Sequence, residues 1–278
     1  MKFTIQKVRH DLLNAENDEV AIEEPLEIKI LYGIENEMLQ KIISVTMRTP
    51  GNDAELARGF LFTEGIITNA EDISNIYQNK GNENVINVDL KSGLAFNLSK
   101  MERNFYTTSS CGVCGKSSIE AIRTICPFPQ KTDLLKISLD VLYTLPGKLK
   151  LKQEIFKNTG GIHGCALFDT EGNLLLSRED VGRHNAVEKL VGAAINLSML
   201  PMNQSVLLLS GRASFELIQK AWMTGIKVVA AIGAPSSLAI QLARESGITL
   251  VGFLKEKSFN IYSEPGRIHF NTAQNIVA

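Results

Sequence analysis

The stretch VLLLSGRAS at residues 206–214 decides the fold class, because an apolar run leads directly into a turn of small residues. The same pattern returns in VVAAIGAPSS at 228–237, and a third short apolar run, TLVGF, occupies residues 249–253. Short strands that are apolar throughout are typical of a parallel sheet covered on both faces. Helices are expected to join them over residues 214–223 and 236–246. The pattern predicts an α/β domain with a mostly parallel sheet.

A smaller, β-rich domain is expected in the first part of the chain. Short apolar strands bounded by turns are predicted over residues 26–31, 42–47, 85–90 and 93–98. A polar cap before Leu56 and a glycine at position 65 predict one helix between the second and third strands. The small, glycine-rich stretch that begins at Ser109 divides this part from the rest. We therefore expect two domains, residues 1–105 and 106–278.

The second domain is expected to begin with helices and a hairpin. Three helices are predicted from the sequence pattern, over residues 117–125, 134–149 and 181–197. Pro146 and Gly147 are expected to end the second helix. Two strands, 165–168 and 174–177, are expected to form a hairpin around a TEGN turn. Together with the three apolar strands, these elements repeat the order strand, turn, helix of an α/β fold.

The composition excludes several classes of partner. The chain has 278 residues, 29 of them basic and 30 acidic, so its formal net charge of −1 gives no overall field that attracts nucleic acid or an anionic membrane. No apolar run approaches the roughly 20 residues that cross a bilayer, and the N-terminus lacks the apolar core of a signal peptide. We expect a cytoplasmic protein that binds neither nucleic acid nor membrane.

Two of the small-residue turns are candidate anion sites. Ser210, Gly211 and Arg212 follow the first apolar strand, and Gly233 and Ser236 follow the second. The first N–H groups of a helix and its dipole attract an anion, and Arg212 would add a forked contact. Ligands of open α/β sheets bind at the carboxyl ends of the strands, where both turns are expected. The alternative is that these turns only reverse the chain and cap the helices.

The motif Cys111-Gly-Val-Cys114 carries the sharpest chemical signal. Four cysteines in a chain of this length are too few for a disulfide scaffold. A thiolate is the nucleophile in sulfur transfer, and the pKa of a cysteine falls at a helix N-terminus or near a cation such as Lys116. A persulfide formed on one cysteine can be released when the neighbouring thiolate closes a disulfide. The alternatives are a dithiol redox pair, no function, or a zinc site completed by His163 and Cys165.

A polar cluster marks the start of the helix predicted over residues 181–197. Asp180, Arg183, His184 and Asn185 crowd this position, and such a cluster can serve a ligand. Glu188 follows His184 by one turn and could orient it. The alternative is a solvated capping cluster, because helix starts favour acidic residues in any case.

The motifs occur in the order seen in one family. The blocks are MRTPG at 47–51, ELARGFLFTEGI at 55–66, SCGVCG at 110–115, TGGIHGC at 159–165, REDVGRHNA at 178–186, LSGR at 209–212 and GAPS at 233–236. With these blocks the chain resembles the formate dehydrogenase accessory sulfurtransferases, the FdhD family. The resemblance covers the chain from about residue 40 onward.

The resemblance implies a sulfur carrier. A cysteine desulfurase would supply sulfur as a persulfide on Cys111, with Cys114 assisting, and formate dehydrogenase would receive the product. The acceptor would be the molybdenum bis(molybdopterin guanine dinucleotide) cofactor, and a guanine nucleotide alone is expected to fit the same site. A homodimer is expected as well. The alternative from another class is a non-catalytic chaperone that shelters the cofactor and holds a structural zinc ion.

The family also implies a fold and a cofactor-binding segment. The C-terminal domain is expected to be a three-layer domain like that of cytidine deaminases. The family's cofactor-binding segment corresponds to Phe253, Leu254, Lys255, Glu256, Lys257 and Ser258. Lys255 stands where arginine is expected, and lysine keeps the charge but loses the bidentate fork. Deaminase chemistry is not expected, because zinc deaminases need His-x-Glu and Pro-Cys-x-x-Cys, whereas here Gly164 and Cys165 follow His163 and Ser110 precedes Cys111. No metal of its own is expected either.

Overall fold

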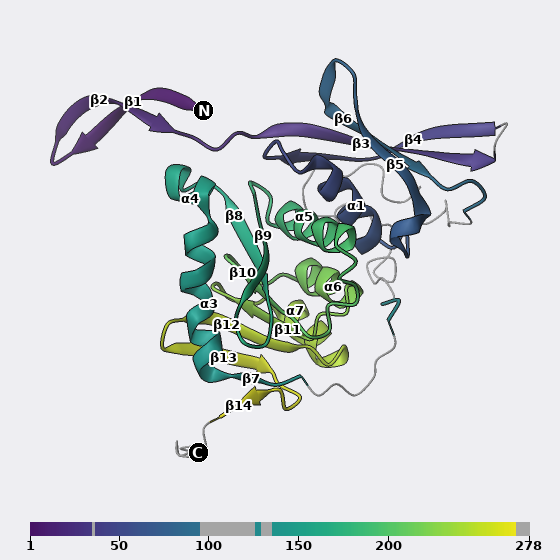
Figure 1. The fold of residues 1–278 in the computed structure, drawn as a ribbon. Helices are drawn as coiled ribbons and strands as arrows, with labels where there is room; N and C mark the ends of the chain where they lie inside the picture. The colour runs from purple at the N-terminus through teal and green to yellow at the C-terminus, as the bar shows by residue number, and fades with distance from the viewer. Residues whose placement is uncertain (35–36, 95–125, 129–134, 271–278) are drawn as a thin grey trace.

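The computed structural model describes residues 1–34, 37–94, 126–128 and 135–270. The helix predicted over residues 117–125, the domain boundary near residue 105 and most of the strand predicted over 93–98 lie outside these ranges. The remaining elements form two main sheets that are joined by packed helices (Figure 1).

A six-stranded sheet lies at the centre of the second half of the chain (Figure 1). Its order is β13-β12-β11-β10-β8-β9, with β8 (His163–Phe168), β9 (Leu174–Asp180), β10 (Val206–Leu209), β11 (Val228–Ala231), β12 (Thr249–Lys255) and β13 (Ser258–Ser263). The three apolar strands β10, β11 and β12 are parallel, as predicted. The expectation of a mostly parallel sheet is wrong for the outer pairs, since β8 runs antiparallel to β9 and β10, and β13 to β12. Two of these pairs, β8–β9 and β12–β13, are hairpins, and a short connection allows only antiparallel pairing.

Helices cover both faces of this sheet. Helix α3 (Leu139–Lys152) packs on one face, and α5 (Arg183–Asn196), α6 (Phe215–Met223) and α7 (Ser237–Glu245) pack on the other (Figure 1). Successive residues of a strand point to opposite faces, so Val206 and Leu208 join the core under α3, whereas Leu207 and Leu209 join the core under α5 to α7. The domain therefore has three layers, as expected. Kinship with cytidine deaminases stays a prediction.

Helix α3 does not end where the sequence suggests. Ser138 caps it, because its Oγ accepts the N–H of Val141 at 3.2 Å, and the helix continues through Pro146. The prediction that Pro146 and Gly147 end this helix is wrong. An internal proline costs about 3 kcal/mol. Three leucines of α3 are buried against the sheet, and each stabilises the fold by roughly 1.5–3 kcal/mol, which offsets the loss. These are Leu142, Leu145 and Leu149.

The first half of the chain builds a four-stranded sheet of order β4-β3-β6-β5. Its elements are β3 (Glu24–Ile34), β4 (Glu37–Arg48), β5 (Ile73–Asn79) and β6 (Asn82–Leu90), with α1 (Asp53–Thr63) and a short 3-10 helix η1 (Ala70–Asp72) between β4 and β5. The strands predicted over 26–31, 42–47 and 85–90 and the helix that follows Asn52 are confirmed. Strand β5 was not predicted, because ISNIYQN mixes apolar and polar residues without a clear period.

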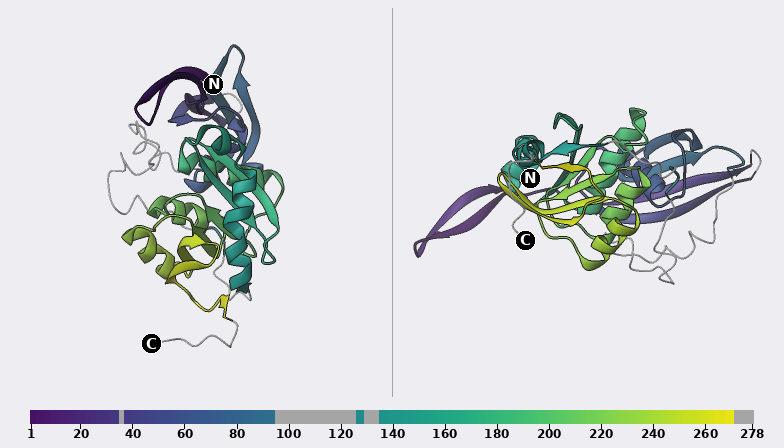
Figure 2. Two further views of the ribbon diagram at one scale, coloured as in Figure 1. Left: turned by 90° about the vertical axis from the view of Figure 1, so that its left-hand side faces the viewer. Right: turned by 90° about the horizontal axis from the view of Figure 1, so that it is seen from below.

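An N-terminal hairpin of β1 (Lys2–Arg9) and β2 (Leu12–Glu19) extends away from the rest of the molecule (Figures 1 and 2). The sequence LLNAENDE of β2 is rich in residues that strands disfavour, so this hairpin was not predicted. At the other end, β7 (Ile137–Ser138) pairs with β14 (Ile268–His269) and ties the last described segment to the start of α3.

The two halves meet where α1 crosses α5 at very short range. A Cβ atom added to Gly59 of α1 would lie 1.9 Å from the carbonyl oxygen of Glu188, and one added to Gly192 of α5 would lie 1.9 Å from that of Glu55. Only glycine permits backbones to approach so closely. The glycine of the ELARGFLF block is thus explained by helix packing.

One buried ion pair and the hydrogen bonds around it fix the same junction. Asp180 at the end of β9 is fully buried and lies 2.7 Å from the Nζ of Lys189, and it also accepts the backbone N–H of Thr49 at 3.1 Å. Lys189 donates to the carbonyl of Thr49 at 2.7 Å. The side chain of Asn185 donates to the carbonyl of Met47 at 2.8 Å. These contacts join the MRTPG block to the REDVGRHNA block, although the two lie far apart in the sequence.

A second buried group of charges joins α1, α5 and α6. The Nζ of Lys220 lies 2.8 Å from both Glu64 and Glu188. Burial raises the pKa of Glu188 to about 6, while the positive charge of Lys220 opposes that rise. Burial opposes the charged form of Lys220, but the two carboxylates together outweigh it and raise the pKa of Lys220. Removal of Lys220, or of its carboxylate partners, would leave buried charge without an opposite charge beside it.

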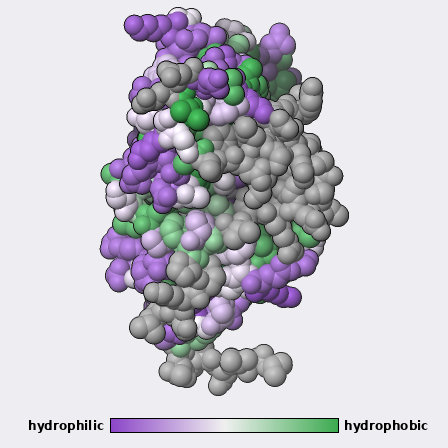
Figure 3. Space-filling view, turned by 90° about the vertical axis from the view of Figure 1, so that its right-hand side faces the viewer, coloured by the Kyte–Doolittle hydropathy of each residue, from purple (hydrophilic) through white to green (hydrophobic). Residues whose placement is uncertain are grey.

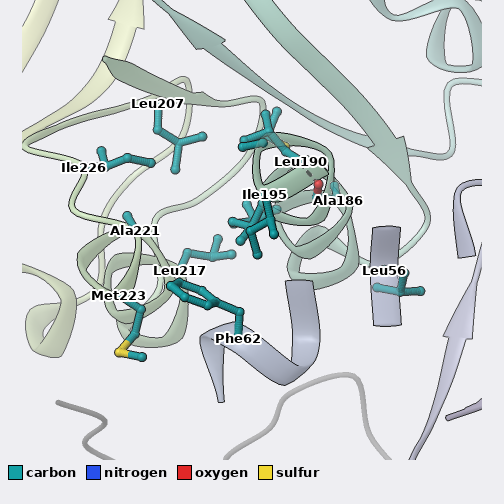
Figure 4. Close-up of a cluster of buried hydrophobic side chains, with 14 of the residues drawn as sticks. Leu56, Phe62, Ala186, Leu190, Ile195, Leu207, Leu217, Ala221, Met223 and Ile226 are labelled. Carbon is teal, nitrogen blue, oxygen red and sulfur yellow. Dashed lines mark hydrogen bonds between the residues drawn. The ribbon is translucent and has the colours of Figure 1, made fainter. Parts of the chain in front are cut away.

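Apolar side chains fill the space between these helices. In Figure 4, Phe62 of α1 points toward Leu217 of α6, and Ile195 of α5 lies between this pair and Leu190. The same cluster continues into the four-stranded sheet through residues such as Ile28. The two sheets are therefore connected by one continuous core.

The surface is mixed in character. Figure 3 shows hydrophilic and apolar residues side by side on the face that it presents. Several apolar side chains are exposed along β4, among them Ile42 at 44% and Val45 at 48%.

Among the described residues, no helix combines the length and apolar character needed to cross a membrane.

We predict that Gly59→Ala lowers the free energy of unfolding by about 3 kcal/mol, because the added methyl group meets backbone that cannot move without separating α1 from α5. Urea denaturation measures this loss. Gly147→Ala is the matched control, since nothing lies within 4 Å of its added Cβ and alanine in a helix should stabilise by about 0.5–1 kcal/mol. Equal effects of the two substitutions would contradict the packing argument.

Candidate functional site

A cavity of about 590 Å³ opens at the carboxyl ends of the parallel strands. Five segments line it: the end of α3 with the start of α4 (Glu154–Thr159), the residues 160–163, the turn at Ser210 and Gly211, Ile232 after β11, and Glu256 between β12 and β13. The cavity thus lies where ligands of open α/β sheets bind.

Backbone hydrogen bonds hold the three strand ends side by side. The N–H of Gly233 donates to the carbonyl of Gly211 at 2.9 Å, and the N–H of Phe253 donates to the carbonyl of Gly233 at 3.1 Å. A Cβ on Gly233 would lie 2.9 Å from the backbone of Gly211 and Arg212, so glycine is required there. The structure therefore brings together the two candidate anion turns and the end of the third strand, as the sequence predicted.

Ser210 lines the cavity and has a hydroxyl hydrogen to donate. Its Oγ accepts the N–H of Gly164 at 2.8 Å, and its own N–H donates to the carbonyl of Gly164 at 2.9 Å. The hydroxyl hydrogen has no acceptor among the described residues, nor does the N–H of Gly211. Both donors are thus available to an anion in the cavity.

Three basic side chains gather beside this turn. His163 lines the cavity, and its ring nitrogen Nδ1 would lie 3.4 Å from a Cβ on Gly211. Burial lowers the pKa of His163, and the positive charges of Arg183 and Arg212 lower it further, while Asp180 opposes them. Among the described residues, neither arginine has an ion-pair partner, and the Nε of Arg183 is buried without a hydrogen bond. The local charge favours an anionic ligand.

The family's cofactor-binding segment forms the β12–β13 hairpin. Glu256 lines the cavity. Phe253 has a φ of 53°, a left-handed conformation that is rare for an aromatic residue, and such strain is often found at functional sites. Leu254 is buried in the core under α3, so its side chain is not available to a ligand. Lys255, Lys257 and Ser258 are exposed around the turn.

His184 does not line the cavity. Its side chain is buried, with Nε2 3.4 Å from the Oγ of Ser214 and 3.9 Å from a carboxylate oxygen of Glu216. The expectation that Glu188 orients His184 is wrong, because Glu188 is occupied by Lys220. The residues of the predicted polar cluster have different roles. Asp180 and Asn185 bind the MRTPG block, whereas Arg183 lies near the cavity.

The second turn acts chiefly in capping. The Oγ of Ser236 accepts the N–H of Ala239 at 3.3 Å at the start of α7. Neither Gly233 nor Ser236 lines the cavity. The capping alternative therefore describes Ser236, whereas Ser210 and Gly211 form part of the cavity wall.

The cysteines differ sharply in setting. Cys111 and Cys114 lie outside the described residues. Cys165 is buried, its thiol donates to the carbonyl of Ala186 at 3.1 Å, and burial raises its pKa. A zinc ligand must be a thiolate, so Cys165 is a poor fourth ligand for the alternative zinc site. The thiol of the half-buried Cys126 donates to the carbonyl of Trp222 at 3.1 Å.

The sequence did not predict that α3 and α4 form one wall of the cavity. Lys150, Gln153 and Phe156 line the cavity, although the sequence around them has no motif. Their role follows from the continuation of α3 through Pro146, which carries the helix end to the strand ends. No local signal distinguishes Gln153 from a surface glutamine.

These features define an α/β protein with a cavity at the carboxyl ends of its parallel strands, lined by hydrogen-bond donors and flanked by basic side chains. The FdhD/NarQ family profile matches residues 21–269, and the chain belongs to this family.

Relatives match along nearly their whole length. The chain is 49% identical over 261 residues to the sulfur carrier protein FdhD of Mycolicibacterium paratuberculosis, across 91% of this chain and 93% of that protein. It is 41% identical over 267 residues to the sulfur carrier protein FdhD of Sulfurisphaera tokodaii, across 96% and 98% of the two chains. A solved structure, described as a candidate formate dehydrogenase accessory protein from Desulfotalea psychrophila, shares the fold with a TM-score of 0.73 at 24% identity, over 97% of this chain and 99% of that one.

We predict that the pKa of His163 rises when an anion binds in the cavity. The free protein should titrate His163 below the ordinary pKa of 6.5, and bound sulfate should raise that pKa because it stabilises the imidazolium. Sulfate affinity should then increase as the pH falls through this range. Proton NMR titration with and without sulfate measures the change, with His163→Gln to assign the signal and His269→Gln as control. An unchanged midpoint at saturating sulfate would show that the anion binds elsewhere.

Proposed function

We propose that this chain is a cytoplasmic sulfur carrier that serves formate dehydrogenase. A cysteine desulfurase would supply sulfur as a persulfide on Cys111, and the chain would pass it to the molybdenum bis(molybdopterin guanine dinucleotide) cofactor before that cofactor enters formate dehydrogenase. Membership of the FdhD/NarQ family and the names of its relatives support this function.

The cavity is the observation that carries the proposal. Its donors, the Ser210 hydroxyl and the Gly211 N–H, are suited to the phosphates of a guanine dinucleotide, and His163 adds a titratable donor. Arg212 and Arg183 supply positive charge, and neither forms an ion pair with a carboxylate of the described residues, although Asp180 lies near enough to oppose their effect on His163. The exposed Lys255 and Lys257 add charge near the rim. A guanine nucleotide alone would occupy the same groups.

The proposed chemistry balances without an external oxidant. The Cys111 thiolate attacks the outer sulfur of the donor's persulfide, and the donor's thiolate leaves. In delivery, the Cys114 thiolate attacks the inner sulfur of the Cys111 persulfide. A Cys111–Cys114 disulfide forms, and hydrosulfide passes to the acceptor. The disulfide must be reduced before the next cycle, so each turn consumes one external thiol pair.

Intact mass spectrometry tests the carrier role. After incubation with a cysteine desulfurase and cysteine, the wild type should gain sulfur that a reductant removes, and Cys111→Ala should gain none. Cys114→Ala should load but release sulfur slowly. Cys126→Ala is the control, because that thiol is half-buried and bonded to a backbone carbonyl. A wild type that gains no sulfur and carries one zinc ion would instead favour the chaperone with a structural metal.

We also propose that two copies associate through the edge strand β4. The exposed apolar residues Ile42 and Val45 on this edge support the proposal, since an uncovered strand edge readily pairs with another chain. Sedimentation velocity should give twice the mass of one chain for the wild type. Ile42→Glu should shift the protein toward monomer, whereas Leu197→Glu, at another exposed apolar position, should not. A monomeric wild type would refute the dimer.

A further inference from the structure

Gln153 is a buried residue whose side-chain amide faces the cavity and has no hydrogen-bond partner among the described residues. It is only 7% exposed, it lines the cavity, and its side-chain amide makes no hydrogen bond with any residue in the described part of the chain. Only its backbone carbonyl is engaged, by the N–H of Lys157 at 3.0 Å. The amide atoms reach the solvent of the cavity although the residue as a whole is buried. A ligand in the cavity can therefore replace water as their hydrogen-bond partner.

The structure holds Gln153 firmly in this position. It is the single residue between the end of α3 and the start of α4. The carboxylate of Glu179 accepts the N–H groups of Ile155 and Phe156 at 3.0 and 2.9 Å, which fixes the first turn of α4. Its position therefore does not depend on a flexible loop.

A glycine makes room for the glutamine. A Cβ on Gly164 would lie 2.6 Å from the Nε2 of Gln153 and 3.0 Å from its Cδ. The amide therefore lies across the Cα of Gly164. The same glycine donates its N–H to the Oγ of Ser210 at 2.8 Å. Gly164 thus contacts both the amide of Gln153 and the hydroxyl of Ser210, and this contact places the two side chains close together on the cavity wall.

We infer that Gln153 is a phosphate-positioning residue of the cavity, whose amide N–H donates to the same phosphate group as the Ser210 hydroxyl. This inference rests on the proposed function and names one further residue of its site. The donor set then consists of Gln153, Ser210 and the Gly211 N–H, with His163 at one side. Neutral donors of this kind fix the position of an anion, while the nearby arginines supply attraction over a longer range.

Calorimetric titration with inorganic pyrophosphate and with guanosine diphosphate tests the assignment. Gln153→Met keeps the size of the side chain but removes the amide, and it should weaken both ligands by the same factor, about tenfold or more. Gln153→Glu places a negative charge beside the phosphate and should weaken both further. Gln204→Glu makes the same charge change at an exposed position before β10, away from the cavity, and should change neither.

Gly164→Ala gives an independent measurement, because its methyl group would displace the amide of Gln153 while leaving the glutamine in place. It should weaken both ligands as well, and thermal unfolding checks that each variant folds. Loss of affinity for guanosine diphosphate alone would overturn the inference, since the amide would then contact the base. Unchanged affinities in Gln153→Met would overturn it too and leave the cavity's function intact. A wild type that binds neither ligand would refute both the inference and the proposed cofactor site.

Discussion

The close crossing of α1 and α5 is the constraint on which the rest of the molecule depends. Gly59 and Gly192 bring the two backbones together so tightly that no side chain fits between them. Because α5 also covers one face of the six-stranded sheet, this contact connects the four-stranded sheet to the cavity-bearing domain. Burial of the apolar residues around the crossing then stabilises both halves as one core.

The charged residues buried beside this crossing stabilise the fold only when each has its oppositely charged partner. Asp180 needs Lys189 and the backbone of Thr49, and Lys220 needs both Glu64 and Glu188. Such groups tolerate few alternative arrangements, since any shift of α5 against α1 would leave a charge without a partner. They also hold the β9–α5 connection, and with it Arg183, beside the cavity.

The cavity combines fixed backbone with side chains that keep unused hydrogen-bonding capacity. The three strand ends are joined by backbone hydrogen bonds, so the donors of Ser210 and Gly211 need no rearrangement to meet an anion. Among the described residues, the Nε of Arg183 is buried without a hydrogen bond, which a folded protein rarely maintains without a reason, and the Gln153 amide faces the cavity without a protein partner. A ligand that supplies oxygen acceptors accounts for these features together.

The sequence by itself determined the strands β10 to β12, the turns at Ser210 and Gly233, and the family, because apolar runs and small-residue turns are local signals. Only the tertiary structure decided the antiparallel outer pairs of the sheet, the continuation of α3 through Pro146, and the glycine contact between α1 and α5. It also separated Ser210, which lines the cavity, from His184, which is buried away from it. The physical reason is that the burial of a residue and the formation of a cavity depend on residues distant in sequence. Gln153 therefore becomes a buried residue of the cavity wall only when α3, β8 and β10 pack together.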